Sequence, residues 1–511
     1  MSELPRSFNY GEETLTPEIA LAITRNETKG IISRETKEKV KKSAYAVHQI
    51  ANGQVAVYGI NTGFGPLCTT RISKEETRTL QKNLLMSHAV GVGKPIADEL
   101  SKLMMVLKLH ALCKGYSGVR VSTIERMLWH IEEDIIPVVP SQGSVGASGD
   151  LAPLAHLFLP LIGLGKVRRQ GRVVDSGEAL RDYDLPVLEL GPKEGLGLIN
   201  GTQFIAAHAV LIVEKLENVL THANIAGAMM IEGLLASVKP FAKELHELRP
   251  YEGSGYTATF IRHLLEDSEV VQSHVNCTRV QDPYSLRCIP QVHGASRNAW
   301  LHLKELVQIE LNAVTDNPII FSEDHTISGG NFHGQLLALP IDYTCLAAAE
   351  IGNISDRRIY LSLEGDTPGV PKLLLKETGT NSGFMIAQYT TAALASENKG
   401  LCFPSSADSI PTSMGQEDHV SMGSISGRKA LQVIDNVEKI IGIELFCAAQ
   451  ALDFHRPLKS SKPMHAIHEF FRSRIKHVTK DGLLYENMEV AIEMVKKKEL
   501  SALLRSSVSF V

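Results

Sequence analysis

The sequence predicts a mainly α protein, in which a bundle of long helices follows a smaller, loop-rich N-terminal region with little β structure. Three observations predict this class. Apolar residues recur at steps of three and four over long stretches of the chain. Alanine-rich runs at 346–349 and 391–395 favour close helix packing, because small side chains let helix axes approach. Strand signals are scarce.

The N-terminal part contains the shorter expected elements. Asn83 to His88 has the pattern of a helix, in which His88 would ordinarily be a partly buried residue with its hydrogen bonds satisfied. Val167 to Val174 is the clearest strand signal, and Gln170-Gly171 is typical of a hairpin turn within it. Asn200 lies between apolar residues and a glycine, which predicts a cap at the start of the next helix.

The C-terminal part contains the long helices. Periodic apolar residues predict three of them, marked by Ala209, Val213, Leu216, Leu220 and Ala223, by Leu303, Val307, Leu311 and Val314, and by Ile434, Val437, Ile441, Leu445 and Ala448. Asp316-Asn317-Pro318 is expected to stop the second. We expect residues 1–200 to form the N-terminal region and 201–511 the helix bundle, within one continuous domain.

Composition narrows the class of protein. The 511 residues are 44% hydrophobic and 21% charged, with a net charge of -5, which favours neither nucleic acid nor an anionic membrane as a partner. The longest apolar stretch, Leu151 to Gly165, is too short to span a bilayer. Seven scattered cysteines without a Cys-x-x-Cys pair indicate free thiols in a reducing compartment, so a cytoplasmic location is expected. His465 and His468 lie one helical turn apart, but a polar helix face explains them better than a metal site, and no metal is assigned.

The most informative segment runs from Gly143 to His156 and contains Ala147-Ser148-Gly149. Gly149 has no Cβ, so its nitrogen could approach the carbonyl carbon of Ala147 and close a five-membered ring. The Ser148 hydroxyl could then leave as water and give an electrophilic exocyclic methylene. The spacing excludes the Gly-x-Ser-x-Gly elbow of serine hydrolases. Small-residue clusters usually mark turns, so the triplet alone is a weak signal.

Five further segments carry polar residues in unusual surroundings, and each could also be purely structural. They are the glycine-rich loop Tyr58 to Pro66, the helical segment Asn83 to His88, the segment around Asn200, the turn Gln281 to Cys288, and Gln416 to His419. The loop lacks the glycine spacing and the lysine of a phosphate-binding site. It could instead be a lid that carries Tyr58 to a substrate.

Together with the Gly143–His156 string, these segments resemble the aromatic amino-acid ammonia-lyase family, in the same order along the chain. The resemblance extends from about Tyr58 to the region of Asp453, includes 328–333 and 381–388, and is strongest to the histidine-specific branch. It implies that Ala147-Ser148-Gly149 forms a 4-methylidene-imidazol-5-one autocatalytically, with no external cofactor. Asp150 would assist the dehydration.

The resemblance also implies roles for individual side chains. Tyr58 would remove the β-proton, although a free tyrosine has a pKa of about 10 and the site must favour its phenolate. His88 and Glu417 would contact the substrate imidazole. Arg287 would bind the carboxylate, as a planar guanidinium does well. The remaining implied site residues are Gln281 and Tyr284 beside Arg287, Asn200 near the ring, and Phe332 packed against it.

The implied reaction is the elimination of ammonia from L-histidine to give trans-urocanate, the first step of histidine degradation. A tyrosine or phenylalanine ammonia-lyase or an aminomutase is the alternative, which His88 and Glu417 disfavour. The family implies a homotetramer whose active sites are shared between chains. Gly415 replaces an asparagine that is common in relatives, which leaves the backbone geometry before Glu417 in question.

Overall fold

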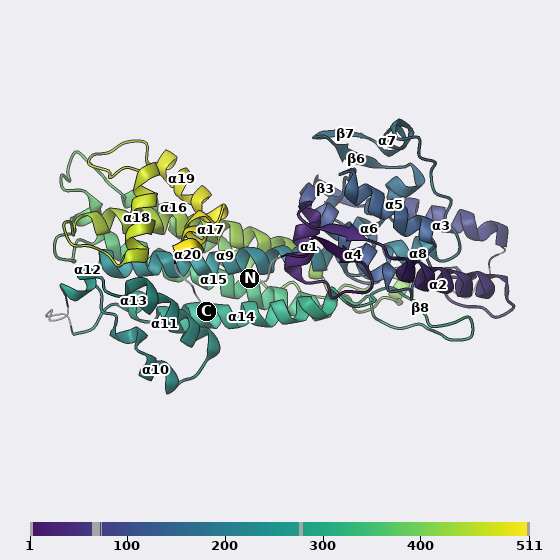
Figure 1. Cartoon of the computed structure of the whole chain (residues 1–511), viewed down its shortest axis with the longest axis horizontal. Coiled ribbons are helices and arrows are strands. Elements are labelled where there is room, and N and C mark those ends of the chain that lie inside the picture. The colour runs from purple at the N-terminus through teal and green to yellow at the C-terminus, as the bar shows by residue number, and fades with distance from the viewer. Residues whose placement is uncertain (1–3, 64–71, 73, 275–279, 508–511) are drawn as a thin grey trace. The chain divides into compact units, whose positions relative to one another are not determined.

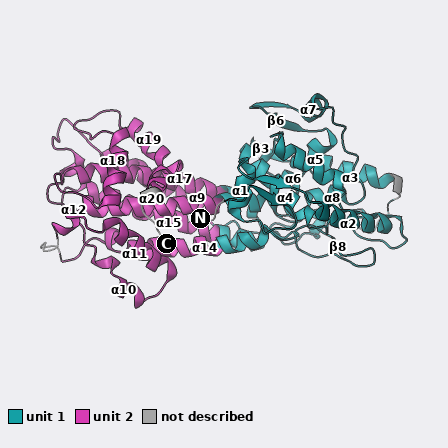
Figure 2. Cartoon of the chain, viewed as in Figure 1, with its two compact units in different colours: residues 1–211, 303–341, 404–428 teal, residues 212–302, 342–403, 429–511 magenta. Residues whose placement is uncertain are grey.

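The computed structural model describes residues 4–63, 72, 74–274 and 280–507 (Figure 1). Helices dominate and the strands are short, so the predicted mainly α class is confirmed. The chain forms two compact units (Figure 2): residues 1–211, 303–341 and 404–428 make unit 1, and 212–302, 342–403 and 429–511 make unit 2. The division at Gly201 stays a prediction, and the first segment of unit 1 ends nearby, at Leu211.

Four long helices contribute residues to both units: α9 (Gln203–Gly233), α14 (Ile289–Glu310), α15 (Gln335–Leu363) and α17 (Gly423–Asp453). The helices predicted after Gly201 and around 434–448 are confirmed as α9 and α17.

The helix predicted to continue to Asp316 ends earlier, at Glu310, so that part of the prediction was wrong. The Asn312 side chain explains the early end. Its Nδ2 donates to the Gln308 carbonyl and to the Leu15 carbonyl, each at 2.9 Å, and its Oδ1 accepts the Leu15 N–H at 2.9 Å. These side-chain bonds compete with the helical pattern and attach the chain to a distant segment.

Unit 1 contains the N-terminal helices and every strand of the described residues. Its other helices are α1 (Pro17–Thr24), α2 (Arg34–Asn52), α3 (Lys74–His88), α4 (Asp98–Cys113), α5 (Val121–Glu132), α6 (Leu151–Phe158), η2 (Leu159–Ile162), α7 (Ser176–Asp182), α8 (Glu194–Ile199) and η5 (Ser413–Gly415). Helix α4 is buried along nearly its whole length, including the polar side chains of Lys102, Lys108 and His110.

The strands form small, separate sheets. They are the parallel pair β1 (Ser7–Asn9) and β2 (Lys29–Ile31), and the antiparallel sets β3 (Val92–Pro95) with β5 (Pro140–Gln142), β4 (Ile136–Pro137) with β6 (Lys166–Arg169) and β7 (Arg172–Asp175), and β8 (Ile319–Ile320) with β9 (Thr326–Ile327). The predicted hairpin is confirmed as β6–β7. Gln170 and Gly171 turn it with φ of 49° and 77°, as a two-residue hairpin loop requires.

The described residues of unit 2 form helices and connecting loops, with no strand among them. Its shorter helices are η3 (Lys239–Phe241), α10 (Lys243–Glu247), α11 (Glu252–Leu265), α12 (Glu269–Gln272), α13 (Tyr284–Arg287), η4 (Lys372–Leu374), α16 (Met385–Leu401), α18 (Lys462–Arg474), α19 (Leu484–Lys496) and α20 (Glu499–Ser507). In the part of the chain that the structure describes, no helix is long and apolar enough to cross a membrane. The five described cysteines are free thiols, and Cys68 and Cys277 lie outside the described residues.

Candidate active site

A cavity of about 690 Å³ in unit 1 gathers side chains from distant parts of the sequence. Six of the predicted site residues line it, namely Tyr58, His88, Ser148, Asn200, Phe332 and Glu417. They come from the α2–α3 loop, the end of α3, the loop before α6, the end of α8, the segment before α15 and the turn before α17. The fold therefore brings together residues up to 359 positions apart in the chain.

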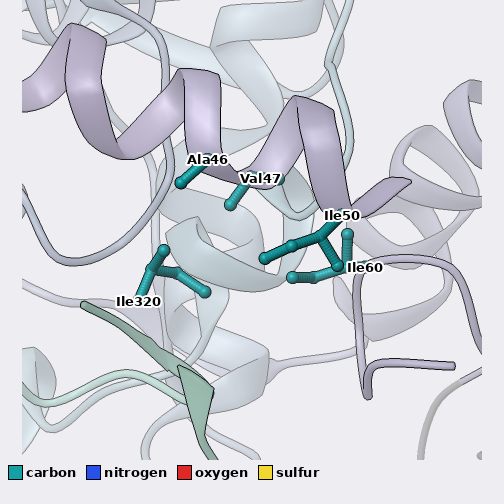
Figure 3. Packing of buried hydrophobic residues seen from close by; sticks show 5 residues of the cluster. All are labelled: Ala46, Val47, Ile50, Ile60 and Ile320. Atoms are coloured by element: carbon teal, nitrogen blue, oxygen red, sulfur yellow. The ribbon is translucent and has the colours of Figure 1, made fainter. Parts of the chain in front are cut away.

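The loop that carries Tyr58 is anchored on both sides of this residue. The Asn61 side chain accepts the Val57 N–H at 2.8 Å and donates to the Val55 carbonyl at 2.9 Å. Ile60 packs in a buried cluster with Ala46, Val47, Ile50 and Ile320 (Figure 3). Tyr58 is therefore held at the cavity by its neighbours. The continuation of this predicted loop, residues 64–66, lies outside the described residues.

His88 is the last residue of α3, and it is half-buried. Burial lowers the pKa of its imidazole, and this outweighs the opposite effects of the Leu84 backbone hydrogen bond and of the Glu417 carboxylate. The Ser87 hydroxyl lies 3.0 Å from Nδ1. A largely neutral imidazole is thus presented to the cavity, with one ring nitrogen able to accept a hydrogen bond and the other able to donate one.

The Ala147-Ser148-Gly149 tripeptide lies in a tight, buried turn. Gly149 has a φ of +77°, and a Cβ at this position would lie 2.1 Å from the Gly201 carbonyl oxygen, so only glycine fits. Asn200 Nδ2 donates to the Ser148 carbonyl at 2.7 Å. The Ser148 hydroxyl donates to Glu417 Oε1.

Asn200 does not cap the start of a helix, and that prediction was wrong. It ends α8, and α9 begins three residues later, at Gln203. Its side chain turns instead to Ser148, 52 positions earlier in the sequence. A contact at this separation leaves no local signal.

Asp150 is completely buried beside the tripeptide. Its carboxyl accepts the Ser144 hydroxyl at 2.8 Å and the Ile205 N–H at 3.0 Å. Burial raises the pKa of Asp150 to about 7, against the lowering effect of these hydrogen bonds. A carboxyl with such a pKa can hold or release a proton near neutral pH.

Glu417 is half-buried and accepts several hydroxyl groups. Thr412 Oγ1 and Ser413 Oγ donate to Oε2 at 3.1 and 2.8 Å, and Ser148 donates to Oε1. Gly415 adopts a φ of +85°, a conformation that glycine takes without strain and that asparagine tolerates better than most residues. The substitution seen in the sequence is therefore compatible with this turn.

Gln281, Tyr284 and Arg287 are not among the residues that line the unit 1 cavity. They line a separate cavity of about 760 Å³ in unit 2. The Arg287 guanidinium carbon lies 4.2 Å from the centre of the Tyr284 ring, and its Nε donates to the Asp282 carbonyl at 3.0 Å. The predicted carboxylate-binding group therefore belongs to a second surface of the chain.

His468, which the sequence analysis left without a metal, is buried in α18. Its Nδ1 lies 2.9 Å from Arg456 Nη2. A guanidinium beside an imidazole nitrogen disfavours a cation there. The described residues contain no cluster of histidine, cysteine and carboxylate groups that could hold a metal ion.

Lys108, which contacts the site through Asn200, was not identified from the sequence. Its Nζ donates to the Asn200 carbonyl at 2.6 Å, and the residue is 1% exposed. The available signal was a lysine inside the apolar stretch from Met104 to Cys113, since lysine is rarely buried without a specific partner.

Comparison with known proteins places these features in a family. The family model described as aromatic amino acid lyase matches residues 15–473. A histidine ammonia-lyase of Myxococcus xanthus is 44% identical over 504 residues, which cover 98% of this chain and 99% of that protein.

Two solved structures have a similar fold. The crystal structure of histidine ammonia-lyase from Trypanosoma cruzi matches with a TM-score of 0.90 and 37% identity, over 98% of this chain and 96% of that chain. The tyrosine aminomutase from Streptomyces globisporus matches with a TM-score of 0.93 and 33% identity, over 99% of this chain and 100% of that chain.

Proposed function

The chain belongs to the aromatic amino acid lyase family, and from this premise we propose that it acts as a histidine ammonia-lyase, which converts L-histidine to trans-urocanate and ammonia. The observation that carries the proposal is the cavity that gathers Tyr58, His88, Ser148, Asn200 and Glu417. An acid–base residue, two groups suited to an imidazole and Ser148 of the cyclisable tripeptide all line this one space.

The tripeptide fits the formation of a methylidene-imidazolone. The Gly149 nitrogen bonds to the Ala147 carbonyl carbon, whose oxygen leaves as water with the hydrogens of the Gly149 and Ser148 nitrogens. The Ser148 hydroxyl leaves as a second water with the hydrogen of the Ser148 Cα. The positive φ of Gly149 and the absence of a Cβ permit the close approach. Asp150 is placed to accept and return protons during these steps, because its pKa of about 7 lies near neutrality.

When formed, the ring supplies an electrophile that makes the substrate amine a better leaving group. Tyr58 accepts the β-proton of the substrate at its phenolate oxygen. The electron pair of the broken C–H bond then forms the Cα–Cβ double bond as the C–N bond breaks. Tyr58 lines the same cavity as Ser148, so the base and the tripeptide that would supply the electrophile border one space.

His88 and Glu417 would make the enzyme prefer histidine as its substrate. A neutral His88 can exchange a hydrogen bond with the substrate imidazole, and the carboxylate of Glu417 can accept its N–H. A phenyl ring offers no such groups, so neither of these hydrogen bonds to the substrate would form. Asn200 and Phe332 border the remaining walls of the cavity.

Arg287, with Gln281 and Tyr284, would bind the substrate carboxylate from another chain of a homotetramer. These three residues line one cavity of unit 2, so they could act together on a carboxylate. A row of exposed apolar side chains along α15, at Leu336, Leu339, Tyr343 and Leu346, supports assembly of several chains. Apolar surface of this kind is typical of protein–protein interfaces.

The alternative is a phenylalanine or tyrosine ammonia-lyase or an aminomutase. The fold does not discriminate, since a tyrosine aminomutase matches it closely. The identity to histidine ammonia-lyases and the pair His88 and Glu417 favour histidine. The cytoplasmic location stays a prediction from the scattered cysteines.

Incubation of the purified protein with L-histidine, L-tyrosine and L-phenylalanine in turn tests the proposal. We expect ultraviolet absorbance of urocanate from L-histidine and little product from the other two. Cinnamate or coumarate as the main product would replace the substrate assignment. A β-amino acid detected by NMR would indicate an aminomutase. The intact protein mass is expected to be two water molecules below the sequence mass.

A further inference from the structure

The segment Asn200-Gly201 holds the tripeptide from one side. The Asn200 amide donates to the Ser148 carbonyl, and the Gly201 carbonyl accepts the Asp150 N–H, both at 2.7 Å. Gly149 and Gly201 also pair as an isolated parallel bridge. The position of this segment therefore determines the positions of the three residues around the ring-closing atoms.

Lys108 holds this segment from the opposite side. Its side chain leaves the buried helix α4, and Nζ donates to the Asn200 carbonyl at 2.6 Å. A Cβ on Gly201 would lie 3.1 Å from this Nζ, so the ammonium is packed directly against the segment. The segment thus lies between the tripeptide and a charged donor.

The surroundings leave this backbone carbonyl as the close acceptor for Lys108. The nearby carboxylate of Asp316 is occupied by Lys193 at 2.7 Å and by the Ser117 hydroxyl at 3.0 Å. Burial and the Lys193 charge lower the pKa of Lys108 to about 8, although Asp316 opposes this, so Nζ stays a charged donor at neutral pH. Hydrogen bonds from charged donors are shorter and stronger than neutral ones.

From these contacts we infer that Lys108 is a positioning residue for ring closure, acting through the Asn200-Gly201 segment. Without it, the Asn200 carbonyl would be a buried acceptor lacking this donor, and the peptide would turn toward another one. Gly201 has a φ of +147° and no side chain to resist such a turn. The Asn200 amide and the Gly201 carbonyl would then move away from the tripeptide.

This inference rests on the proposed function, because it assumes that the tripeptide closes into a ring. The test is therefore the intact mass of freshly purified protein, which reports the loss of two water molecules independently of turnover. The variant is Lys108→Met, which keeps the length of the side chain and removes the donor. Lys102→Met is the matched control, since Lys102 is also buried in α4 but donates to Asn26 Oδ1 at 2.8 Å.

We expect wild type and Lys102→Met to be dehydrated in full, and Lys108→Met to contain at least tenfold less dehydrated chain, with both variants folded by circular dichroism. Equal dehydration of the two methionine variants would overturn the positioning role. This holds also if dehydration is reduced to the same extent in both variants, because such a result would indicate general destabilisation. If wild type itself keeps both waters, the proposed prosthetic group fails, and the positioning role fails with it.

A milder pair applies if Lys108→Met does not fold. Lys108→Gln keeps a neutral donor in place of the charged one, and Lys102→Gln is its control. We expect Lys108→Gln to dehydrate at least threefold more slowly than wild type in a time course after synthesis. A rate equal to that of wild type or of Lys102→Gln would overturn the inference.

Discussion

The pKa values of two side chains at or beside the unit 1 cavity depend on their surroundings. His88 is kept largely neutral because burial lowers its pKa, and Asp150 is brought near neutrality because burial raises its pKa. Burial thus shifts the pKa values of the two groups in opposite directions. Both shifts have consequences that can be measured.

Substitution of His88 by leucine tests the preference for histidine. Loss of a hydrogen bond to the substrate imidazole is expected to lower kcat/KM for L-histidine relative to L-phenylalanine by about tenfold or more, the equivalent of about 1.4 kcal/mol. Met86→Leu, on the same helix and absent from the cavity lining, is the control. An unchanged ratio of the two kcat/KM values would place selectivity elsewhere.

The stability of Asp150→Asn should depend on pH differently from that of wild type. Between the ordinary aspartate pKa of 3.8 and its native pKa of about 7, Asp150 is protonated in the folded state and ionised in the unfolded state. Its contribution to stability is complete below about pH 4 and is lost as the pH rises to 7. The free energy of unfolding of wild type should therefore fall relative to the variant, by up to about 1.4 kcal/mol per pH unit.

Thermal or denaturant unfolding of both proteins from pH 4 to 8 measures this difference. Asparagine can still accept the Ile205 N–H and hydrogen-bond to Ser144, so the local contacts are matched. A difference that does not change over this range would mean that Asp150 is ionised in the folded protein throughout.

At the scale of elements, close packing depends on glycines between helices. Gly253 in α11 and Gly294 in α14 let two backbones meet, because a Cβ on Gly253 would lie 2.1 Å from the Gly294 carbonyl oxygen. Gly255, two residues further along α11, has no neighbour within 4 Å of such a Cβ. The two positions form a natural comparison.

Alanine should therefore have opposite effects at these two glycines. Gly253→Ala is expected to destabilise the protein by about 1–3 kcal/mol, because backbone must move to relieve the overlap. Gly255→Ala is expected to stabilise it by up to about 1 kcal/mol through helix propensity. The melting temperatures of the two variants measure these effects on stability. Equal shifts in melting temperature would show that the crossing of α11 and α14 is not tightly packed.

Periodicity in the sequence was enough to predict α9, α17 and the β6–β7 hairpin, because these elements follow local preferences. It failed at two helix ends. Asn312 ends α14 by binding Leu15, and Asn200 turns to Ser148 instead of starting α9. Each failure involves a side chain whose partner is far away in the sequence, where local patterns carry no information.

At the scale of the whole molecule, the candidate catalytic groups line two cavities, one within each unit. The resemblance led to the six residues of the unit 1 cavity, and the fold brings them together. Gln281, Tyr284 and Arg287 line another cavity. A local sequence pattern cannot indicate which residues of one chain complete the site of another, nor can it identify a buried partner such as Lys108.

Complementation between two inactive variants tests the sharing of sites. Tyr58→Phe removes the proposed base, and Arg287→Met removes the proposed carboxylate ligand. If sites are shared, co-expression should give mixed oligomers in which some sites contain both intact groups. Activity well above the sum of the two separate variants is expected, whereas activity equal to that sum would indicate that each chain completes its own site. Light scattering should give the mass of a tetramer.

The elimination of ammonia from L-histidine is tested most directly by the stoichiometry of a single incubation, with Ser148→Ala as the control. Wild-type protein should release one ammonia for each urocanate formed, and the folded variant should release neither. Consumption of L-histidine without ammonia, or equal product from Ser148→Ala, would contradict an elimination that depends on the Ala147-Ser148-Gly149 tripeptide.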